Sequence, residues 1–180
     1  MGVKGSQTVR IVFENVNGLG IDSSLEWKNH RFITMAKELE FDIVGRSELH
    51  LNWSKAKSHQ RLRERLRQCR WDKLEVCAAH NKHENLHFFQ PEGTSMLALY
   101  QVAFRVSASG ADSAGLGRWA WMLLRGKGVN VRFISAYQTC MMRAEEKYTV
   151  WVQQQRYLKY VKKEQVTPRE AFQHDLTAAI

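Results

Sequence analysis

The fold is decided by Val9-Arg10-Ile11-Val12-Phe13-Glu14-Asn15-Val16-Asn17-Gly18-Leu19 and by Phe41-Asp42-Ile43-Val44-Gly45-Arg46-Ser47-Glu48. The first stretch is β-branched and aromatic over residues 9–13 and then meets a turn-prone Asn-Val-Asn-Gly. The second is apolar over residues 41–44 apart from one aspartate, and it stops at a glycine. Both patterns are typical of strands that end in polar residues.

The segment between these two strands has the spacing of a helix. Its apolar residues recur at positions 25, 32, 35, 36 and 39, and Ser23 or Ser24 is available as N-cap. A strand, crossover helix and strand form a right-handed unit with parallel strands, so Asn15, Asn17 and Glu48 should converge at one edge of the sheet. Amide and carboxylate oxygens there suit a hard cation.

The rest of the chain predicts a layered α/β sandwich, in which consecutive strands follow the βα opening. Strands are expected over residues 74–78, 95–99, 102–106, 119–125 and 131–136, with a hairpin turn at 126–128. A helix over 54–70 carries arginines beside an apolar stripe, and it is either a solvated surface face or a face that follows phosphates. A long helix over 145–163 is expected to turn Tyr148, Trp151, Leu158 and Val161 to the core.

The last helix has a clear start and no clear end. Thr167 as N-cap, Pro168 at the first helical position and Glu170 at the third predict its beginning. Phe172, Leu176 and Ile180 continue an apolar face, and no glycine or asparagine follows to end the helix. The chain is therefore expected to be cut within or just after a helix.

Composition and charge set the outer bounds of function. The chain has 180 residues, of which 44% are hydrophobic, so it can form one globular domain with a sizeable core. Twenty-seven Lys and Arg against eighteen Asp and Glu give a net charge of +9, which is compatible with a nucleic-acid partner and with a merely basic soluble protein.

The cysteines, histidines and N-terminus exclude several classes of protein. Three scattered cysteines form neither a CxxC pair nor a disulfide scaffold, and His83 with His87 is not a zinc signature in a loop-to-strand pattern. No signal core and no apolar run long enough for a membrane span occur, so we expect a soluble intracellular protein, nuclear or cytoplasmic, that does not act at a membrane.

Four motifs, in order, resemble those of the endonuclease/exonuclease/phosphatase superfamily, the DNase I-like nucleases. They are Asn15-Val16-Asn17-Gly18-Leu19 with the later Glu48, then Gln90-Pro91-Glu92-Gly93-Thr94-Ser95, Gly117-Arg118-Trp119 and Ile134-Ser135-Ala136-Tyr137. The resemblance covers residues 8 to about 140 and is closest to the endonuclease domains of LINE-type retrotransposons. It implies a DNase I-like sandwich and a partner that is DNA or another nucleic acid, with either a missing C-terminal half of the same domain or a reverse transcriptase as a further partner.

The resemblance also implies roles for single residues. Glu48, Asn15 and Tyr137 are the expected catalytic residues, and Glu48, Asn15 and Asn17 the expected ligands of Mg²⁺, with Mn²⁺ as an alternative ion. Each residue also has an explanation without a functional role. Glu48 could be an exposed or helix-capping acid, Asn15 and Asn17 could form a turn, and Tyr137 could pack against its neighbours. Arg46 could pair near Glu48 or with phosphate, and Glu92 would place a negative charge near a basic surface.

The resemblance ends before the superfamily's later Asp-x-Asn and Asp-His motifs. His174 and Asp175 stand in the reverse order within a helix pattern and are not expected to replace them. Residues 1–180 therefore read as one partial domain, truncated after its first half to two-thirds, with the second sheet largely missing. Two hypotheses stay open: a Mg²⁺-dependent endonuclease-like phosphodiesterase acting on DNA, incomplete and weakly active or inactive, and a non-catalytic basic nucleic-acid-binding remnant of a mobile-element endonuclease.

Overall fold

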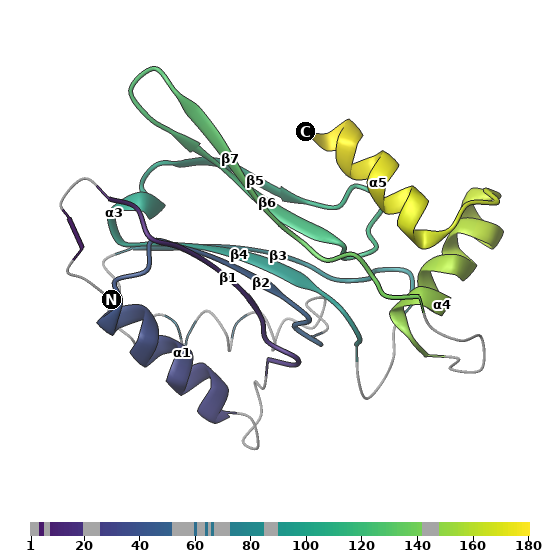
Figure 1. The fold of residues 1–180 in the computed structure, drawn as a ribbon, viewed down its shortest axis with the longest axis horizontal. Coiled ribbons are helices and arrows are strands. Elements are labelled where there is room, and N and C mark those ends of the chain that lie inside the picture. Colours follow the sequence, from purple (N-terminus) through teal and green to yellow (C-terminus); the bar gives the residue numbers. More distant parts are fainter. Residues whose placement is uncertain are drawn as a thin grey trace.

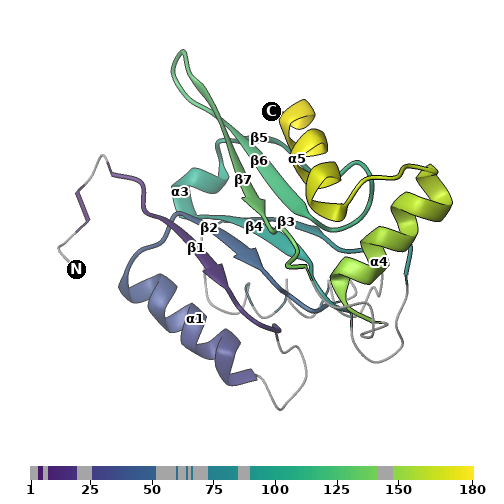
Figure 2. The ribbon, with the colours of Figure 1, turned by 45° about the vertical axis from the view of Figure 1, so that its right-hand side comes forward.

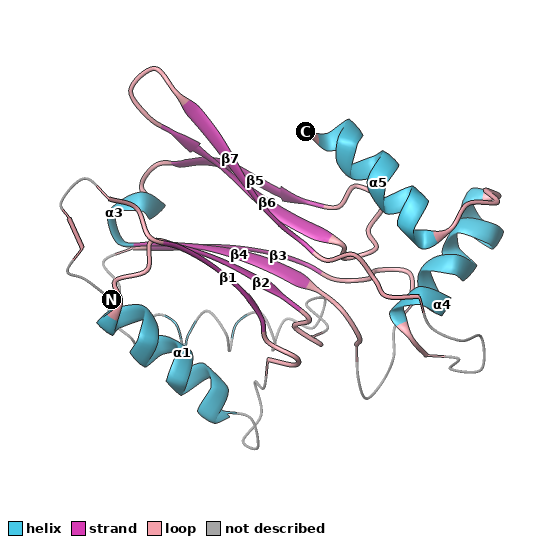
Figure 3. Cartoon of the chain, viewed as in Figure 1, coloured by secondary structure: helices cyan, strands magenta, loops and turns pink. Residues whose placement is uncertain are grey.

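The structure is a computed structural model that describes residues 4–5, 8–19, 26–51, 60, 64, 66, 73–84, 90–141 and 148–180. Two β-sheets stack face to face, and helices lie on the outer side of the first sheet and toward the two ends of the stacked sheets (Figures 1 and 3). Helix α1 (Glu26–Glu38) packs against the first sheet, and helix α5 (Pro168–Ala179) lies beside the second (Figure 2). The predicted layered α/β sandwich is confirmed.

The first sheet contains the strand unit that the sequence predicts. Its strands are β1 (Ile11–Asn15), β2 (Ile43–Ser47), β4 (Thr94–Leu99) and β3 (Leu74–Ala79), in that order across the sheet. Strand β1 runs parallel to β2, with Asn15 opposite Ser47, and α1 crosses between them. Phe32 and Ala36 of α1 are buried in one core cluster with Val44 and Leu97 of the sheet.

The second sheet has the order β5 (Val106–Ala111), β6 (Trp119–Arg125), β7 (Asn130–Ala136). A second core cluster joins Ile43 and Met96 of the first sheet to Met122 and Leu124 of the second. The expectation that the second layer would be largely missing is therefore wrong, because these three strands cover β3, β4 and part of β2. The predicted hairpin turn is confirmed by a bond from the Gly126 N–H to the carbonyl oxygen of Val129.

The predicted strand over residues 102–106 is wrong. The chain forms a short helix, α3 (Tyr100–Ala103), and β5 begins only at Val106. Val102 and Ala103 are buried from one helical turn, and an apolar pair in so short a segment cannot distinguish a turn of helix from a strand.

The predicted helix over 145–163 is shorter than expected and packs differently. It consists of α4 (Val150–Arg156) followed by the π-helix η2 (Tyr157–Lys162). Leu158 is buried as expected and Trp151 is half-buried, but Tyr148 and Val161 are 68% and 63% exposed and do not face the core. The predicted start of α5 is confirmed by a complete capping box between Thr167 and Glu170.

Two further expectations concern the chain's helices. Ile180 is 81% exposed, so it does not continue the apolar face of α5. The predicted helix over 54–70 lies mostly outside the described residues, although Gln60, Glu64 and Leu66 are helical and Leu66 is buried. Within the described part of the chain, no helix has the length and apolarity that crossing a membrane requires.

Candidate functional site

The candidate site lies where β1 and β2 end side by side. Backbone bonds continue beyond the strands: the Gly18 N–H donates to the Glu48 carbonyl oxygen at 2.7 Å, and the Leu19 N–H to that of Leu49 at 2.8 Å. The His50 N–H then donates to the carbonyl oxygen of Glu92 at 2.8 Å. Three loops are thus tied together at one edge, and this edge carries Asn15, Asn17 and Glu48 as the motif spacing predicts.

The backbone of this edge is strained. Asn17, Glu48, His50 and Glu92 all have left-handed backbone angles, with φ of 42°, 54°, 54° and 63°. They are four of the seven non-glycine residues with positive φ in the described part of the chain. Such angles are sparsely populated by residues with side chains and persist where the surrounding structure fixes them. The bonds between the three loops do so here.

Glu48 and Tyr137 come together from different sheets. Glu48 directly follows β2, and Tyr137 directly follows β7, where its N–H donates to the carbonyl oxygen of Arg118 at 2.8 Å. Burial raises the pKa of the Tyr137 phenol, and a hydrogen bond to Glu48 and the charge of that carboxylate raise it further. Tyr137 is therefore a neutral donor at physiological pH, and Glu48 is held in position by it.

Asn15 and Asn17 form a turn at the end of β1. The side-chain oxygen of Asn15 accepts from the Asn17 N–H at 3.0 Å, which fixes the amide in place. The ammonium group of Lys28, on α1, donates to the carbonyl oxygens of Val16, Asn17 and Gly18 at 3.0, 2.7 and 3.1 Å. The turn that the sequence offered as the alternative explanation is present, and the Asn15 oxygen keeps a second lone pair for another partner.

His50 belongs to this site although the motifs did not indicate it. It is half-buried, and burial lowers the pKa of its imidazole; the Lys28 charge acts in the same direction and the Glu48 charge opposes it. The imidazole is therefore neutral near pH 7 and has one nitrogen that can accept a proton. Its position two residues after Glu48 was the only signal in the sequence.

Arg46, for which the sequence left a partner near Glu48 and a phosphate as alternatives, pairs with Glu14. It is 1% exposed, and its Nε donates to Glu14 at 2.6 Å while its guanidinium lies 3.4 Å from the ring centroid of Phe32. Glu14 and Arg46 are directly opposite each other on β1 and β2. Arg46 therefore lies beneath the surface beside the site as part of an ion pair.

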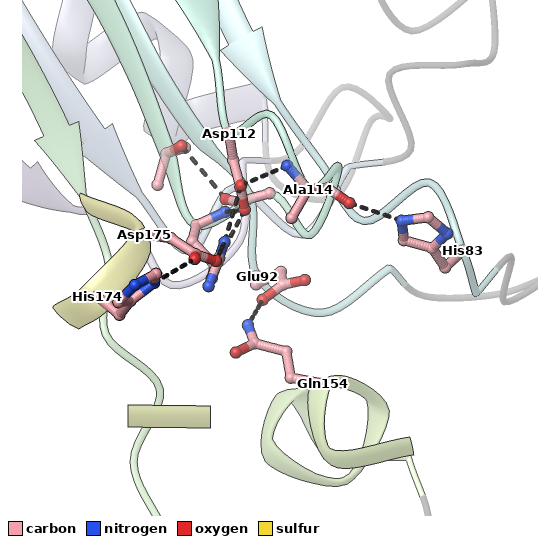
Figure 4. Close-up of polar contacts among 10 residues, drawn as sticks. His83, Glu92, Asp112, Ala114, Gln154, His174 and Asp175 are labelled. Atoms are coloured by element: carbon pink, nitrogen blue, oxygen red, sulfur yellow. Dashed lines mark hydrogen bonds and ion pairs between the residues drawn. The ribbon is translucent and has the colours of Figure 1, made fainter. Parts of the chain in front are cut away.

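Glu92 is placed differently from expectation, because it carries no charge to the surface. It is 1% exposed, and its Oε2 accepts from the Gln154 side-chain amide at 2.8 Å (Figure 4). Its Oε1 has no hydrogen-bond partner among the described residues. Burial raises the pKa of this carboxyl group well above its ordinary value, so the protonated form is favoured.

His174 and Asp175 do not provide a substitute for the absent Asp-His pair. Their side chains are adjacent at 3.2 Å on α5, but Asp175 accepts from Arg118 Nη2 at 2.7 Å (Figure 4). Arg118 is buried and also binds Asp112, with 2.6 Å between Nε and Oδ2. This ion-pair network anchors α5 to the second sheet.

The donor set at the edge is compatible with Mg²⁺ bound largely through water and substrate. Among the described residues no group of three or more His, Cys, Asp or Glu side chains could hold a metal. Glu48 is a single half-buried carboxylate with amide oxygens nearby, and Mg²⁺ commonly uses one or two carboxylates while keeping several waters or phosphate oxygens. Glu48 would be the direct ligand, with Asn15 and Asn17 as neutral oxygen donors.

Comparisons with known proteins agree with this fold. An endonuclease/exonuclease/phosphatase family protein from Leptotrichia buccalis C-1013-b has a similar structure, with a TM-score of 0.53 at 12% sequence identity. The match covers 88% of this chain and 64% of that protein. No protein-family model and no curated protein matches the sequence. The fold is thus of the type that the sequence motifs indicated.

Proposed function

We propose that this chain is a Mg²⁺-dependent phosphodiesterase domain that acts on DNA. The observation that carries the proposal is the carboxylate of Glu48, held by Tyr137 at the end of parallel strands, in a fold shared with an endonuclease/exonuclease/phosphatase family protein. The net charge of +9 supports a polyanionic substrate. The LINE-type origin, the reverse transcriptase partner and the intracellular location remain predictions.

Each residue of the edge has a different role in the proposed hydrolysis. A Mg²⁺ ion held by Glu48 and the asparagine amides would neutralise charge on the phosphoryl oxygens. Tyr137, as a neutral phenol, donates its one proton to Glu48 and so orients the carboxylate. The neutral imidazole of His50 can accept a proton from an attacking water. Lys28 fixes the turn that carries Asn15 and Asn17.

A plasmid-nicking assay with Mg²⁺ tests the proposal. Glu48→Gln keeps the size of the side chain and removes its charge, so nicking should fall at least about 100-fold, the usual scale for removing one electrostatic catalytic group. Glu164→Gln is the matched control, since Glu164 is exposed and lies near the end of η2, and it should nick like the wild type. Nicking that survives Glu48→Gln would refute the assignment.

The second hypothesis, a non-catalytic nucleic-acid-binding domain, is favoured by the strong positive charge and by the absence, among the described residues, of a group of three or more His, Cys, Asp or Glu side chains that could hold a metal. It predicts DNA binding that falls steeply with salt and does not depend on Glu48, with no nicking in Mg²⁺ or Mn²⁺. A salt titration of DNA binding, run beside the nicking assay, separates the two. Binding that is undetectable at low salt would remove both hypotheses.

A further inference from the structure

A groove next to the candidate site has the lining expected for a nucleotide. It has a volume of about 260 Å³ and lies between α1 and the end of β1. Its lining includes Trp27, Lys28 and Arg31 of α1 and Asn15 and Arg46 of the strands. Asn15 belongs both to the lining of the groove and to the candidate site, so the groove adjoins the end of β1 at which the candidate site lies.

Trp27 is the unusual feature of the groove. Its indole is 56% exposed on the first turn of α1, whereas Phe32, on the same helix, is 4% exposed in the core. An exposed tryptophan contributes little to folding, and a flat aromatic face at the surface can stack on a nucleobase of any sequence. The groove is slightly smaller than the roughly 300–1,000 Å³ of typical small-molecule pockets, so it suits one base rather than several.

The charges around the groove match a nucleic-acid strand. Three cations line it, Lys28, Arg31 and Arg46, against the single carboxylate of Glu14, which is already paired with Arg46 at 2.6 Å. Arg46 Nη1 is buried without a hydrogen-bond partner among the described residues, so the Glu14 ion pair leaves donor capacity of this guanidinium unused. An aromatic platform within a positive surface is the arrangement by which proteins bind single strands without reading their sequence.

From these observations we infer that the groove binds an unpaired base of the DNA strand that crosses the candidate site, with the base stacked on Trp27. This inference rests on the proposed action on DNA and adds a substrate preference to it: a strand that is single or locally unpaired next to the bound phosphodiester. Trp27 is a positioning residue in this scheme, because it contacts the substrate away from the reacting atoms.

The test is a binding assay in EDTA, where no cleavage occurs. Two labelled oligonucleotides with the same number of phosphates are compared, one of thymidines and one of abasic sites. The wild type should bind the thymidine strand roughly 5- to 150-fold more tightly, the range contributed by one stack of a base on an aromatic side chain. Trp27→Ala should bring this ratio close to one, and Trp27→Phe should retain most of it.

A matched control is Tyr160→Ala. Tyr160 is another exposed aromatic residue, 68% exposed beside Lys159 on η2, and its loss should leave the ratio unchanged. Arg31→Gln should weaken both oligonucleotides equally and flatten the salt dependence, because a phosphate contact does not distinguish them. The inference is overturned if the wild type shows no base preference, if Trp27→Ala keeps it, or if Tyr160→Ala loses it equally.

This binding assay and the plasmid-nicking assay together separate the inference from the proposed function. Base preference that depends on Trp27, in a protein that does not nick plasmid, supports the groove and refutes only the catalytic proposal. Nicking that depends on Glu48, without any base preference, supports the catalytic proposal and refutes only the groove. The two variants act on different elements, since Trp27 lies on α1 and Glu48 follows β2.

Discussion

Replacing Glu92 by glutamine should stabilise the protein increasingly as the pH rises. The Glu92 carboxyl is 1% exposed, and burial raises its pKa well above the ordinary value of 4.5. A group whose pKa is raised in the folded state contributes its full stability below the unfolded pKa and loses it as the pH rises through the folded pKa. Glutamine cannot ionise, so the variant avoids this loss.

The size of the effect follows from the linkage between proton binding and folding. Below pH 4.5 both forms of residue 92 are neutral and nearly equal in shape, so the two proteins should have similar free energies of unfolding. Above this pH the variant should gain about 1.4 kcal/mol for each pH unit until the folded pKa is reached. For a chain of this size, each 1 kcal/mol corresponds to about 2–4 °C in Tm.

The assay is thermal or urea unfolding of both proteins from pH 4 to pH 8. Glu170→Gln is an internal control of opposite sign, since hydrogen bonds from Thr167 lower the pKa of the Glu170 carboxyl at the start of α5. The ionised Glu170 carboxylate stabilises the wild type above the unfolded pKa, and this stabilisation is lost as the pH falls through the folded pKa. Glu170→Gln should therefore have a lower free energy of unfolding than the wild type at neutral pH and approach the wild type in acid.

One pattern of results would refute the reasoning about Glu92. If Glu92→Gln differs from the wild type by a constant amount at every pH, or is less stable at pH 8, then the carboxylate is ionised and well partnered in the folded protein. The bond from Gln154 would then dominate over burial. In that case the negative charge expected from the sequence would be real, although buried.

Two other predictions concern the site and the turns. Glu48→Gln should lower the pKa of the Tyr137 phenol but leave it above the ordinary value of 10, because burial is the larger cause and remains. Ultraviolet titration, with a Tyr137→Phe variant to identify the Tyr137 signal, measures this pKa. An unchanged pKa would contradict the hydrogen bond between Tyr137 and Glu48. Gly117→Ala should lower the free energy of unfolding by about 1–3 kcal/mol more than Gly128→Ala. Both glycines have positive φ, but a Cβ at Gly117 would lie 2.7 Å from the His80 carbonyl carbon, whereas one at Gly128 would meet nothing within 4 Å; equal losses in urea unfolding would refute this.

The first sheet was predictable because its signals are local. Apolar runs end at turn residues, and a helical spacing between them implies a parallel crossover, which the register of Asn15 opposite Ser47 confirms. The same register explains the partner of Arg46, which the sequence left open. Glu14 and Arg46 each lie one residue before this pair, so the parallel alignment places them opposite each other, and Arg46 pairs with Glu14.

The rest of the site depends on contacts between distant parts of the chain. Tyr137 reaches Glu48 only because the second sheet packs on the first, and only the resemblance to known nucleases pointed to it. Glu92 is buried because α4 places Gln154 over it, and no local pattern shows that a glutamine on a helix will face inward. The side chain of His50 is placed by a left-handed backbone angle, which the residue type alone does not reveal.

The left-handed backbone angles of Glu48 and His50 indicate that their side chains have a role beyond folding. Asparagine and histidine adopt a left-handed backbone more readily than most residues, but glutamate gains nothing from it, and each such residue costs about 1–3 kcal/mol. Glycine at Glu48 or His50 would relieve that strain while keeping the backbone bonds between the three loops, which involve only main-chain atoms. A fold selected for stability alone would therefore favour glycine at both positions. The presence of a carboxylate and an imidazole there supports a role for the side chains themselves, at the edge where the proposed reaction takes place.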